Sequence, residues 1–142
     1  RLQGDWSSDV CSSDLDGSVK IIDFGLSSKL DKDTDIIKLD TLRGAIGYIA
    51  PECMYLRYIS KYSDIWSFGV LIYAMEFGYM PFSIKDYKEY RFETINKEVQ
   101  FPKEADPNLV IIIQKCLHQM DYERYTARQL LKELLSHFIK KL

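Results

Sequence analysis

The 142-residue chain has few of the residues that build disulfide scaffolds, metal centres or membrane spans. Its three cysteines, Cys11, Cys53 and Cys116, are widely separated and show neither paired metal-ligand spacing nor a disulfide framework. Such usage is typical of a reducing compartment, so we expect an intracellular protein, in the cytoplasm. The longest apolar run, residues 70–75, is too short to cross a bilayer, so we expect no membrane span.

The chain also lacks an excess of charge of either sign. Its 19 lysine and arginine residues and 21 aspartate and glutamate residues give a net charge of -2. Nucleic acids and anionic membranes favour a basic protein surface, so we expect neither as a partner. A hydrophobic content of 46% is ordinary for a globular protein, and the length suits one domain or part of one.

The first half of the chain predicts little regular structure. Asp16 and Gly17 form a turn signal, and the β-branched residues that follow predict a short strand over residues 19–22. Residues 23–52 show no sustained periodicity, which favours a long functional loop.

Four helices are predicted in the second half. The first covers residues 61–77, ends before Gly78, and is apolar on every side, which indicates central burial. The second covers residues 85–97. The third runs from the N-cap Asp106 to residue 119, and the fourth follows the capping-box pair Thr126 and Gln129 over residues 127–139. We therefore predict a mainly α fold with a short β-hairpin or strand before the long loop.

Three short motifs occur in order: Asp23-Phe24-Gly25, Ala50-Pro51-Glu52, and Asp-Ile-Trp-Ser-Phe-Gly at residues 64–69. Each is weak alone, but the ordered set resembles the activation segment and following helix of a eukaryotic protein kinase. The resemblance covers residues 16–142 and implies part of the C-terminal lobe of a Ser/Thr protein kinase domain. Such a domain transfers the γ-phosphoryl group of ATP to a protein hydroxyl with the help of Mg²⁺.

The resemblance assigns roles at the first motif. Asp23 is implied to bind the Mg²⁺ that bridges the ATP phosphates, because this hard cation prefers oxygen ligands. Phe24 is implied to pack inward, and Gly25 to let the backbone reverse, so the three residues form the cofactor-binding element. The alternative reading of Asp23 is an ordinary turn-forming aspartate.

The long loop carries two further expectations. Thr41 lies where many kinases carry a regulatory phosphothreonine, Thr34 is a second candidate, and solvent-exposed threonines are the alternative. The substrate loop is implied to be Gly44, Ala45, Ile46, Gly47 and Tyr48. Ala45 and Ile46 depart from the Gly-Thr-Pro-Gly-Tyr pattern of the family. The departure keeps open a second function, a pseudokinase or protein-interaction scaffold.

Four residues are implied to be structural. Glu52 is expected to pair with Arg124, Asp64 to hydrogen-bond the catalytic loop, and Trp66 to belong to the central helix. Leu71 and Met75 align with a hydrophobic column on the adenine side, and core packing explains them equally well. The histidines, His118 and His137, have no carboxylate or cysteine residues grouped with them and are expected to be structural or exposed.

The sequence contains no His-Arg-Asp catalytic motif, and residues 5–15 resemble a translated sequencing adapter. We therefore divide the chain into a non-native segment, residues 1–15, and a partial kinase domain, residues 16–142. No catalytic residue is retained, and we expect the chain as written to be inactive and to self-associate through exposed apolar surface. The intact parent would phosphorylate a protein substrate and would itself be phosphorylated by an upstream kinase. An unrelated helical module is the remaining alternative.

Overall fold

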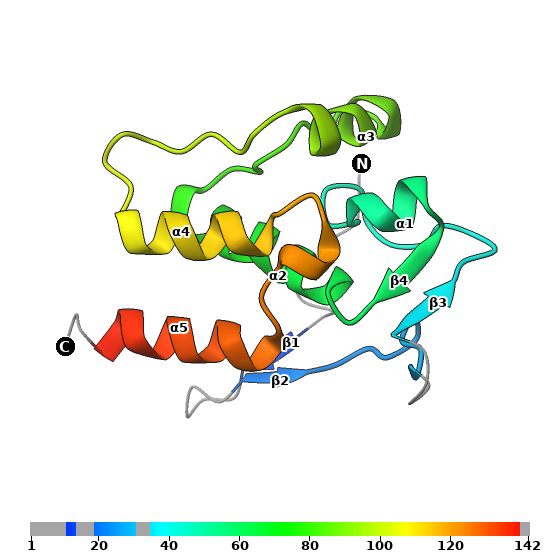
Figure 1. Cartoon of the computed structure of the whole chain (residues 1–142), viewed down its shortest axis with the longest axis horizontal. Coiled ribbons are helices and arrows are strands. Elements are labelled where there is room, and N and C mark those ends of the chain that lie inside the picture. Colours follow the sequence, from blue (N-terminus) through cyan, green and yellow to red (C-terminus); the bar gives the residue numbers. More distant parts are fainter. Residues whose placement is uncertain (1–10, 14–18, 31–34, 140–142) are drawn as a thin grey trace.

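The computed structural model describes residues 11–13, 19–30 and 35–139, with the backbone alone for residues 11–13. The fold is mainly α, as predicted, and Figure 1 shows helix α2 in the middle of the molecule. The elements in chain order are β1 (Cys11–Ser13), β2 (Val19–Ile21), β3 (Ile36–Lys38), α1 (Pro51–Tyr55), β4 (Tyr58–Ser60), α2 (Ser63–Phe77), α3 (Tyr87–Asn96), α4 (Pro107–Cys116), a 3₁₀ turn (Asp121–Glu123) and α5 (Ala127–Ile139).

Two small antiparallel sheets flank the helices. Strand β2 confirms the strand expected at residues 19–22, and it pairs with β1, so that Cys11 lies opposite Ile21. Strand β1 falls within the segment that the sequence set aside as non-native. In the second sheet, Ile36 of β3 lies opposite Ser60 of β4. The expectation that residues 23–52 contain no regular structure was therefore wrong at β3 and at the start of α1.

Helix α2 ends as predicted, because Gly78 adopts the left-handed conformation with φ 77°. The helix is not buried on every side, however. Trp66 and Val70 have no exposed surface, whereas Phe68, Leu71 and Met75 are 41%, 40% and 77% exposed. The explanation that Leu71 and Met75 pack in the core is therefore wrong for this chain. No described element covers the side of α2 on which they lie.

The helix ends follow the expected capping chemistry. Asp106 Oδ1 accepts hydrogen bonds from the backbone N–H groups of Asn108 (2.9 Å) and Leu109 (3.4 Å) and so caps α4. Before α5, the Thr126 N–H donates to Gln129 Oε1 (2.8 Å) and the Gln129 N–H donates to Thr126 Oγ1 (3.3 Å). This reciprocal pair confirms the predicted capping box.

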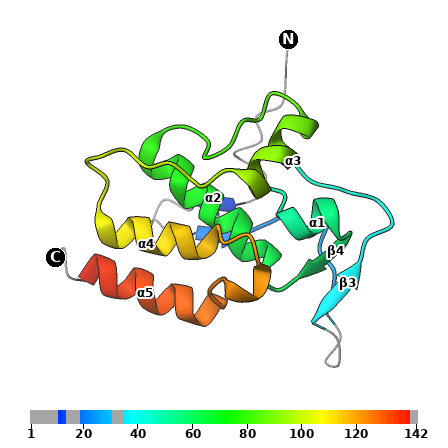
Figure 2. The ribbon, with the colours of Figure 1, turned by 45° about the horizontal axis from the view of Figure 1, so that its top comes forward.

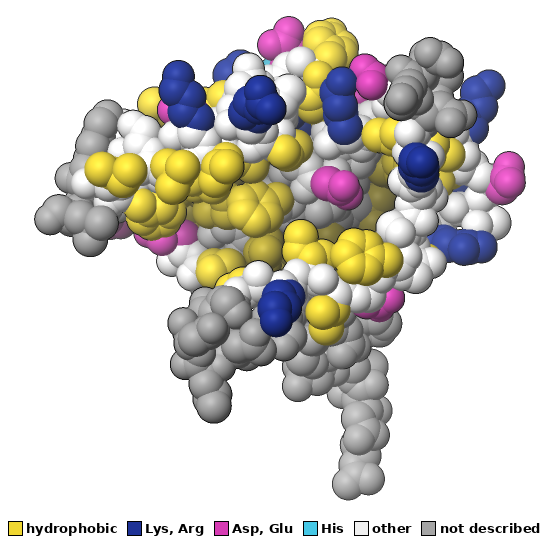
Figure 3. Space-filling model, turned by 90° about the horizontal axis from the view of Figure 1, so that it is seen from below, with side chains coloured by type: hydrophobic (Ala, Val, Ile, Leu, Met, Phe, Trp, Pro, Cys, Tyr) yellow, Lys and Arg dark blue, Asp and Glu magenta, His cyan; other side chains and the backbone are white. Residues whose placement is uncertain are grey.

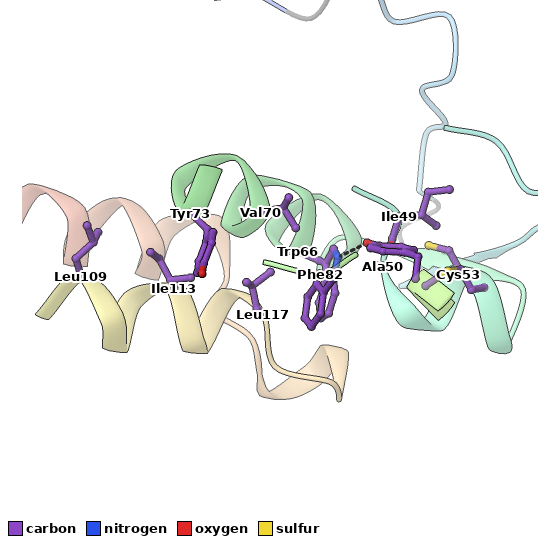
Figure 4. Close-up of a cluster of buried hydrophobic side chains, with 12 residues drawn as sticks. Ile49, Ala50, Cys53, Trp66, Val70, Tyr73, Phe82, Leu109, Ile113 and Leu117 are labelled. Carbon is purple, nitrogen blue, oxygen red and sulfur yellow. Dashed lines mark hydrogen bonds between the residues drawn. The ribbon is translucent and has the colours of Figure 1, made fainter. Parts of the chain in front are cut away.

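The helices pack closely around α2. Figures 1 and 2 show α4 and α5 lying side by side. A Cβ on Gly69 would lie 2.5 Å from Cys116 Cβ, so only glycine permits this approach of α2 to α4. Figure 4 shows Leu109, Ile113 and Leu117 on the α4 side of a cluster that also contains Val70 and Tyr73.

Aromatic rings extend this core toward α3. Trp66 stacks on Phe82, with ring centroids 5.6 Å apart and an interplanar angle of 5°. Tyr90 of α3 is fully buried and meets Phe82 edge-on at 6.3 Å. Among the described residues, no helix combines the length and apolar content needed to cross a membrane.

Hydrophobic side chains also remain on the surface. Figure 3 shows them gathered on the lower face, around a hollow beside α5 and β2. On α5, Leu131, Leu135 and Phe138 are each more than half exposed. Exposed apolar side chains that gather on one face of a protein mark a surface suited to association.

Candidate functional site

A cavity of about 550 Å³ lies between the segment after Asp23, strand β3 and the first turn of α2. It brings together residues from separate motifs of the sequence. Its walls include Gly25, Thr41, Gly44, Ala45, Tyr48 and Asp64. Five other residues singled out in the sequence do not line this cavity: Asp23, Phe24, Ile46, Gly47 and Trp66. Glu52 and Arg124 form a separate, buried site.

Asp23 stands at the edge of this cavity. It is exposed and adopts a left-handed backbone conformation with φ 59°, which aspartate tolerates better than most residues. Its Oδ1 accepts a hydrogen bond from the Gly25 N–H at 3.1 Å. Phe24 is 67% exposed, so the expected inward packing of this ring was wrong for this chain.

The carboxylate of Asp23 fits one ligand of a magnesium ion. Mg²⁺ in phosphate-transfer sites is commonly bound by one or two carboxylates together with phosphate and water oxygens. Within the described residues, no group of three or more His, Cys, Asp or Glu side chains could hold a metal ion. Asp23 therefore suits a site that phosphates complete, and it does not suit a metal centre made by protein alone.

Thr41 lines the cavity and is exposed, so its hydroxyl is accessible. Thr34, the second threonine considered, lies outside the described residues. Phosphate on Thr41 would place negative charge on the wall of the cavity that carries Arg43.

Residues 44–48, which the resemblance predicts to be the substrate loop, have a well-defined backbone conformation. Gly44 and Gly47 adopt positive φ angles of 115° and 105°, and the Tyr48 N–H donates to the Ala45 carbonyl at 3.2 Å. Ser67 Oγ donates to the Tyr48 carbonyl at 2.8 Å. Ile46, in contrast, is 40% exposed. The loop backbone is thus held by Ser67 of helix α2, while the side chain of Ile46 faces solvent.

Tyr90 holds the next residue of the chain. Its hydroxyl donates to the Ile49 carbonyl at 2.8 Å and accepts from Trp66 Nε1 at 3.4 Å. No role was expected for Ser67. Ser67 lies one turn after Asp64 on the same helix, a spacing that could have indicated it. Tyr90 is 41 residues from Ile49, and no local pattern indicates their contact.

The structure brings Glu52 and Arg124 together as a buried ion pair. The two Arg124 Nη atoms donate to Glu52 Oε1 at 2.9 Å and to Oε2 at 2.8 Å. The remaining guanidinium N–H groups donate to the carbonyls of Tyr62 (3.0 Å), His118 (2.8 Å) and Gln119 (3.3 Å). All five donors of the guanidinium are therefore satisfied.

This ion pair sits inside a larger buried network. Ser63 Oγ donates to Glu52 Oε1 at 2.7 Å, and the Arg124 guanidinium lies 5.0 Å from the Trp66 ring centroid. Cys53 is buried beside Ser63, and burial raises the pKa of its thiol to about 11. A thiol with so high a pKa is protonated at neutral pH and is a poor nucleophile.

Asp64 presents a different electrostatic environment. It lies in the first turn of α2 on the cavity wall, where desolvation raises the pKa of its carboxyl although the residue is exposed at the surface. No charge or hydrogen bond from the described residues offsets this effect. The expected partner of Asp64, a catalytic loop, is not part of the sequence.

The two histidines stand apart from the cavity. His118 is exposed, and its Nδ1 lies 3.2 Å from the Met120 carbonyl. His137 is buried on α5, and its Nε2 has no hydrogen-bond partner among the described residues. The His118 carbonyl accepts from Arg124 Nε, as described above, but neither histidine lines the cavity.

Comparison with known proteins gives a consistent result. The family model described as "Protein kinase domain" matches residues 10–136. The chain is 33% identical over 134 residues to the probable serine/threonine-protein kinase mps1 of Dictyostelium discoideum, covering 82% of this chain and 13% of that protein. It is 31% identical over 137 residues to the dual specificity protein kinase TTK of Mus musculus, covering 87% and 16%.

A third relative is the maternal embryonic leucine zipper kinase of Xenopus tropicalis. The two sequences are 36% identical over 125 residues, which is 87% of this chain and 18% of the relative. The chain thus spans less than a fifth of the length of each of these relatives.

Proposed function

Because the chain belongs to the protein kinase domain family, we propose that its parent protein transfers the γ-phosphoryl group of ATP to serine or threonine residues of proteins. The chain supplies part of the C-terminal lobe. The supporting observation is the substrate loop, whose backbone is held by Ser67 and Tyr90 while Ile46 remains exposed. Such a loop offers a firm surface next to the cavity that Asp23 adjoins.

In this proposal Asp23 contributes one carboxylate to a Mg²⁺ ion bound with ATP. The ion would neutralise phosphate charge during transfer. The chain itself holds the carboxylate through the Gly25 N–H. It contains no His-Arg-Asp motif to accept the proton of the substrate hydroxyl, so it is inactive on its own.

A chimera tests this function directly. Residues 16–142 are joined to the upstream half of the kinase domain of a relative, and transfer of labelled phosphate from ATP to protein serine and threonine is measured. We expect transfer by the chimera, none by the isolated chain, and loss of transfer in the Asp23→Asn variant. Activity of the isolated chain, or undiminished activity of Asp23→Asn, would contradict the proposal.

The departure at Ala45 supports one alternative, a pseudokinase that presents this lobe as a protein-binding scaffold. Ala45 lines the cavity and cannot donate or accept the hydrogen bonds of a threonine hydroxyl at that position. A folded chimera that remains inactive, and gains activity in the Ala45→Thr variant, would favour the scaffold.

The partners follow from the same proposal. A protein substrate would lie along the substrate loop, and an upstream kinase would modify Thr41. The free cysteines of the described part, Cys53 and Cys116, suit the reducing cytoplasm. The exposed apolar side chains of α2 and α5 would cause the isolated chain to self-associate.

We further propose that residues 1–15 are foreign to the parent protein. The family match begins at residue 10 and overlaps this segment, and strand β1 pairs residues 11–13 with β2. Determining the coding sequence around codons 1–20 from independent transcripts tests the idea. Recovery of the same Ser/Asp-rich residues would refute it.

A further inference from the structure

Helix α3 contains a buried carboxylate that the proposed reaction does not use. Glu93 is 8% exposed, although most of α3 is polar and faces solvent. Its Oε2 accepts a hydrogen bond from the backbone N–H of Ser83 at 2.6 Å, and its Oε1 forms an ion pair with Lys97 one turn further along the helix. The ion pair and the Ser83 N–H together lower the pKa of Glu93, so the group is ionised at neutral pH.

The N–H of Ser83 lies in the segment between α2 and α3, residues 78–86, where it has no helix or strand partner. Ser83 is half-buried, and its N–H bonds to a charged acceptor, a kind of hydrogen bond that is stronger than one between neutral groups. Phe82, the preceding residue, is anchored in the core against Trp66. The hydrogen bond from the Ser83 N–H to Glu93 therefore holds the part of this segment that follows Phe82.

The same segment covers the substrate loop. A Cβ placed on Gly47 would lie 2.8 Å from Met80 Cε and 2.9 Å from Ile84 Cγ2, so both side chains lie directly over this glycine. Gly47 is buried, while its neighbours Ile46 and Tyr48 are 40% and 37% exposed. The cover on Gly47 thus comes from residues on either side of Phe82 and Ser83.

From these contacts we infer that Glu93 is a positioning residue for the substrate loop. Its carboxylate holds the Ser83 N–H, and this bond sets the backbone direction from Ser83 to Ile84. The side chains of Ile84 and Met80 then cover Gly47. Tyr90, on the same buried side of α3, holds the adjoining Ile49 carbonyl. Helix α3 therefore supports the loop at two neighbouring points. The consequence for substrate binding rests on the proposed function, but the coupling itself does not.

Hydrogen exchange of the whole chain, read by mass spectrometry of peptic peptides, measures this coupling. The reporter is the Tyr48 N–H, which is bonded to the Ala45 carbonyl. In Glu93→Ala we expect this amide to exchange about 10-fold faster or more, since the lost bond to a charged acceptor loosens the cover. Amides of α4, such as Leu117 N–H bonded to the Ile113 carbonyl, should keep their wild-type rate.

Two matched variants separate positioning from general stability. Glu93→Gln keeps an acceptor for the Ser83 N–H and should restore slow exchange at Tyr48. Lys97→Ala removes the ion pair, leaves the Ser83 bond in place, and should also leave Tyr48 slow. Lys97 is more than half exposed, so its truncation spares the core.

An unchanged Tyr48 rate in Glu93→Ala, or an equal acceleration of Tyr48 and α4, would overturn the inference. If Glu93→Ala does not fold, Ile84→Ala provides the same test, because this side chain is 51% exposed and carries little of the core. A wild-type Tyr48 rate in Ile84→Ala is then the refuting result. An inactive kinase chimera with the expected exchange pattern would contradict the proposed function alone.

Discussion

Replacement of Glu52 by glutamine removes one charge from the most deeply buried ion pair described in this chain. The side chains of Glu52 and Arg124 are 3% and 0% exposed. The substitution keeps the shape of the carboxylate but leaves the guanidinium charge uncompensated away from water. It also replaces an oxygen that accepts a hydrogen bond from Arg124 with an amide nitrogen that can only donate.

The expected loss is large. Breaking a buried pair by removing one partner typically costs about 3–5 kcal/mol, against a total folding free energy of about 5–15 kcal/mol. For a chain of this size, each kcal/mol lowers the melting temperature by about 3–4 °C. Glu52→Gln should therefore melt about 10 °C or more below the unmodified chain.

Thermal and urea unfolding, followed by far-UV circular dichroism, measure this loss. The exposed ion pair between Lys61 and Asp35 is a matched control, since its N–O distance of 2.9 Å is almost the same as the 2.8 Å of the buried pair. Its side chains are 45% and 74% exposed, so Asp35→Asn should leave the melting temperature unchanged.

A double variant tests the physical cause. In Glu52→Leu with Arg124→Met both charges disappear, so the loss should be smaller than the sum of the two single losses. A melting temperature for Glu52→Gln within 2 °C of the unmodified chain would refute the argument, as would strict additivity in the double variant.

Two further changes address the surface of the chain. Asp64→Asn should raise the melting temperature at pH 7. The folded-state pKa of Asp64 is raised by burial, so ionisation opposes folding above that pKa, and the gain should vanish below the ordinary aspartate pKa. Equal melting temperatures across this pH range would contradict the assignment. Leu71→Lys with Met75→Lys should reduce self-association in sedimentation velocity without lowering the melting temperature, because both side chains are exposed. Unchanged association would place the contact elsewhere.

Local chemistry made helices α2 to α5 predictable, whereas the five-residue helix α1 was not expected. Asp106, Gly78 and the pair Thr126 and Gln129 act within a few residues of the helix ends that they define, so the printed sequence carries the whole signal. Strands β3 and β4 were missed because each has three residues and its partner residues lie about 20 or more positions away. Such pairing depends on the folded chain and leaves little local pattern.

The site was predictable only in part, for the same reason. The ordered motifs single out Asp23, Asp64 and residues 44–48, whose roles remain predictions, whereas Ser67, Tyr90 and Glu93 bond to backbone groups of residues elsewhere in the chain. A backbone carbonyl or N–H has the same chemistry at every position, so the sequence does not indicate which one a side chain will hold. The exposure of Phe24 likewise depends on which elements surround it, and its own motif does not determine it.

The ion pair of Glu52 and Arg124 is connected through Trp66 and Tyr90 to Ile49, the residue that follows the loop of residues 44–48. The Arg124 guanidinium lies over the Trp66 ring, and Trp66 Nε1 donates to the Tyr90 hydroxyl, which in turn donates to the Ile49 carbonyl. These contacts all lie within the described part of the chain. Asp64, in contrast, lies on the cavity wall, where no charge or hydrogen bond from the described residues offsets its desolvation, and Asp23 lies outside that wall. The described residues therefore retain the contacts that hold the loop of residues 44–49, so the geometry of this loop can be tested separately from catalytic activity.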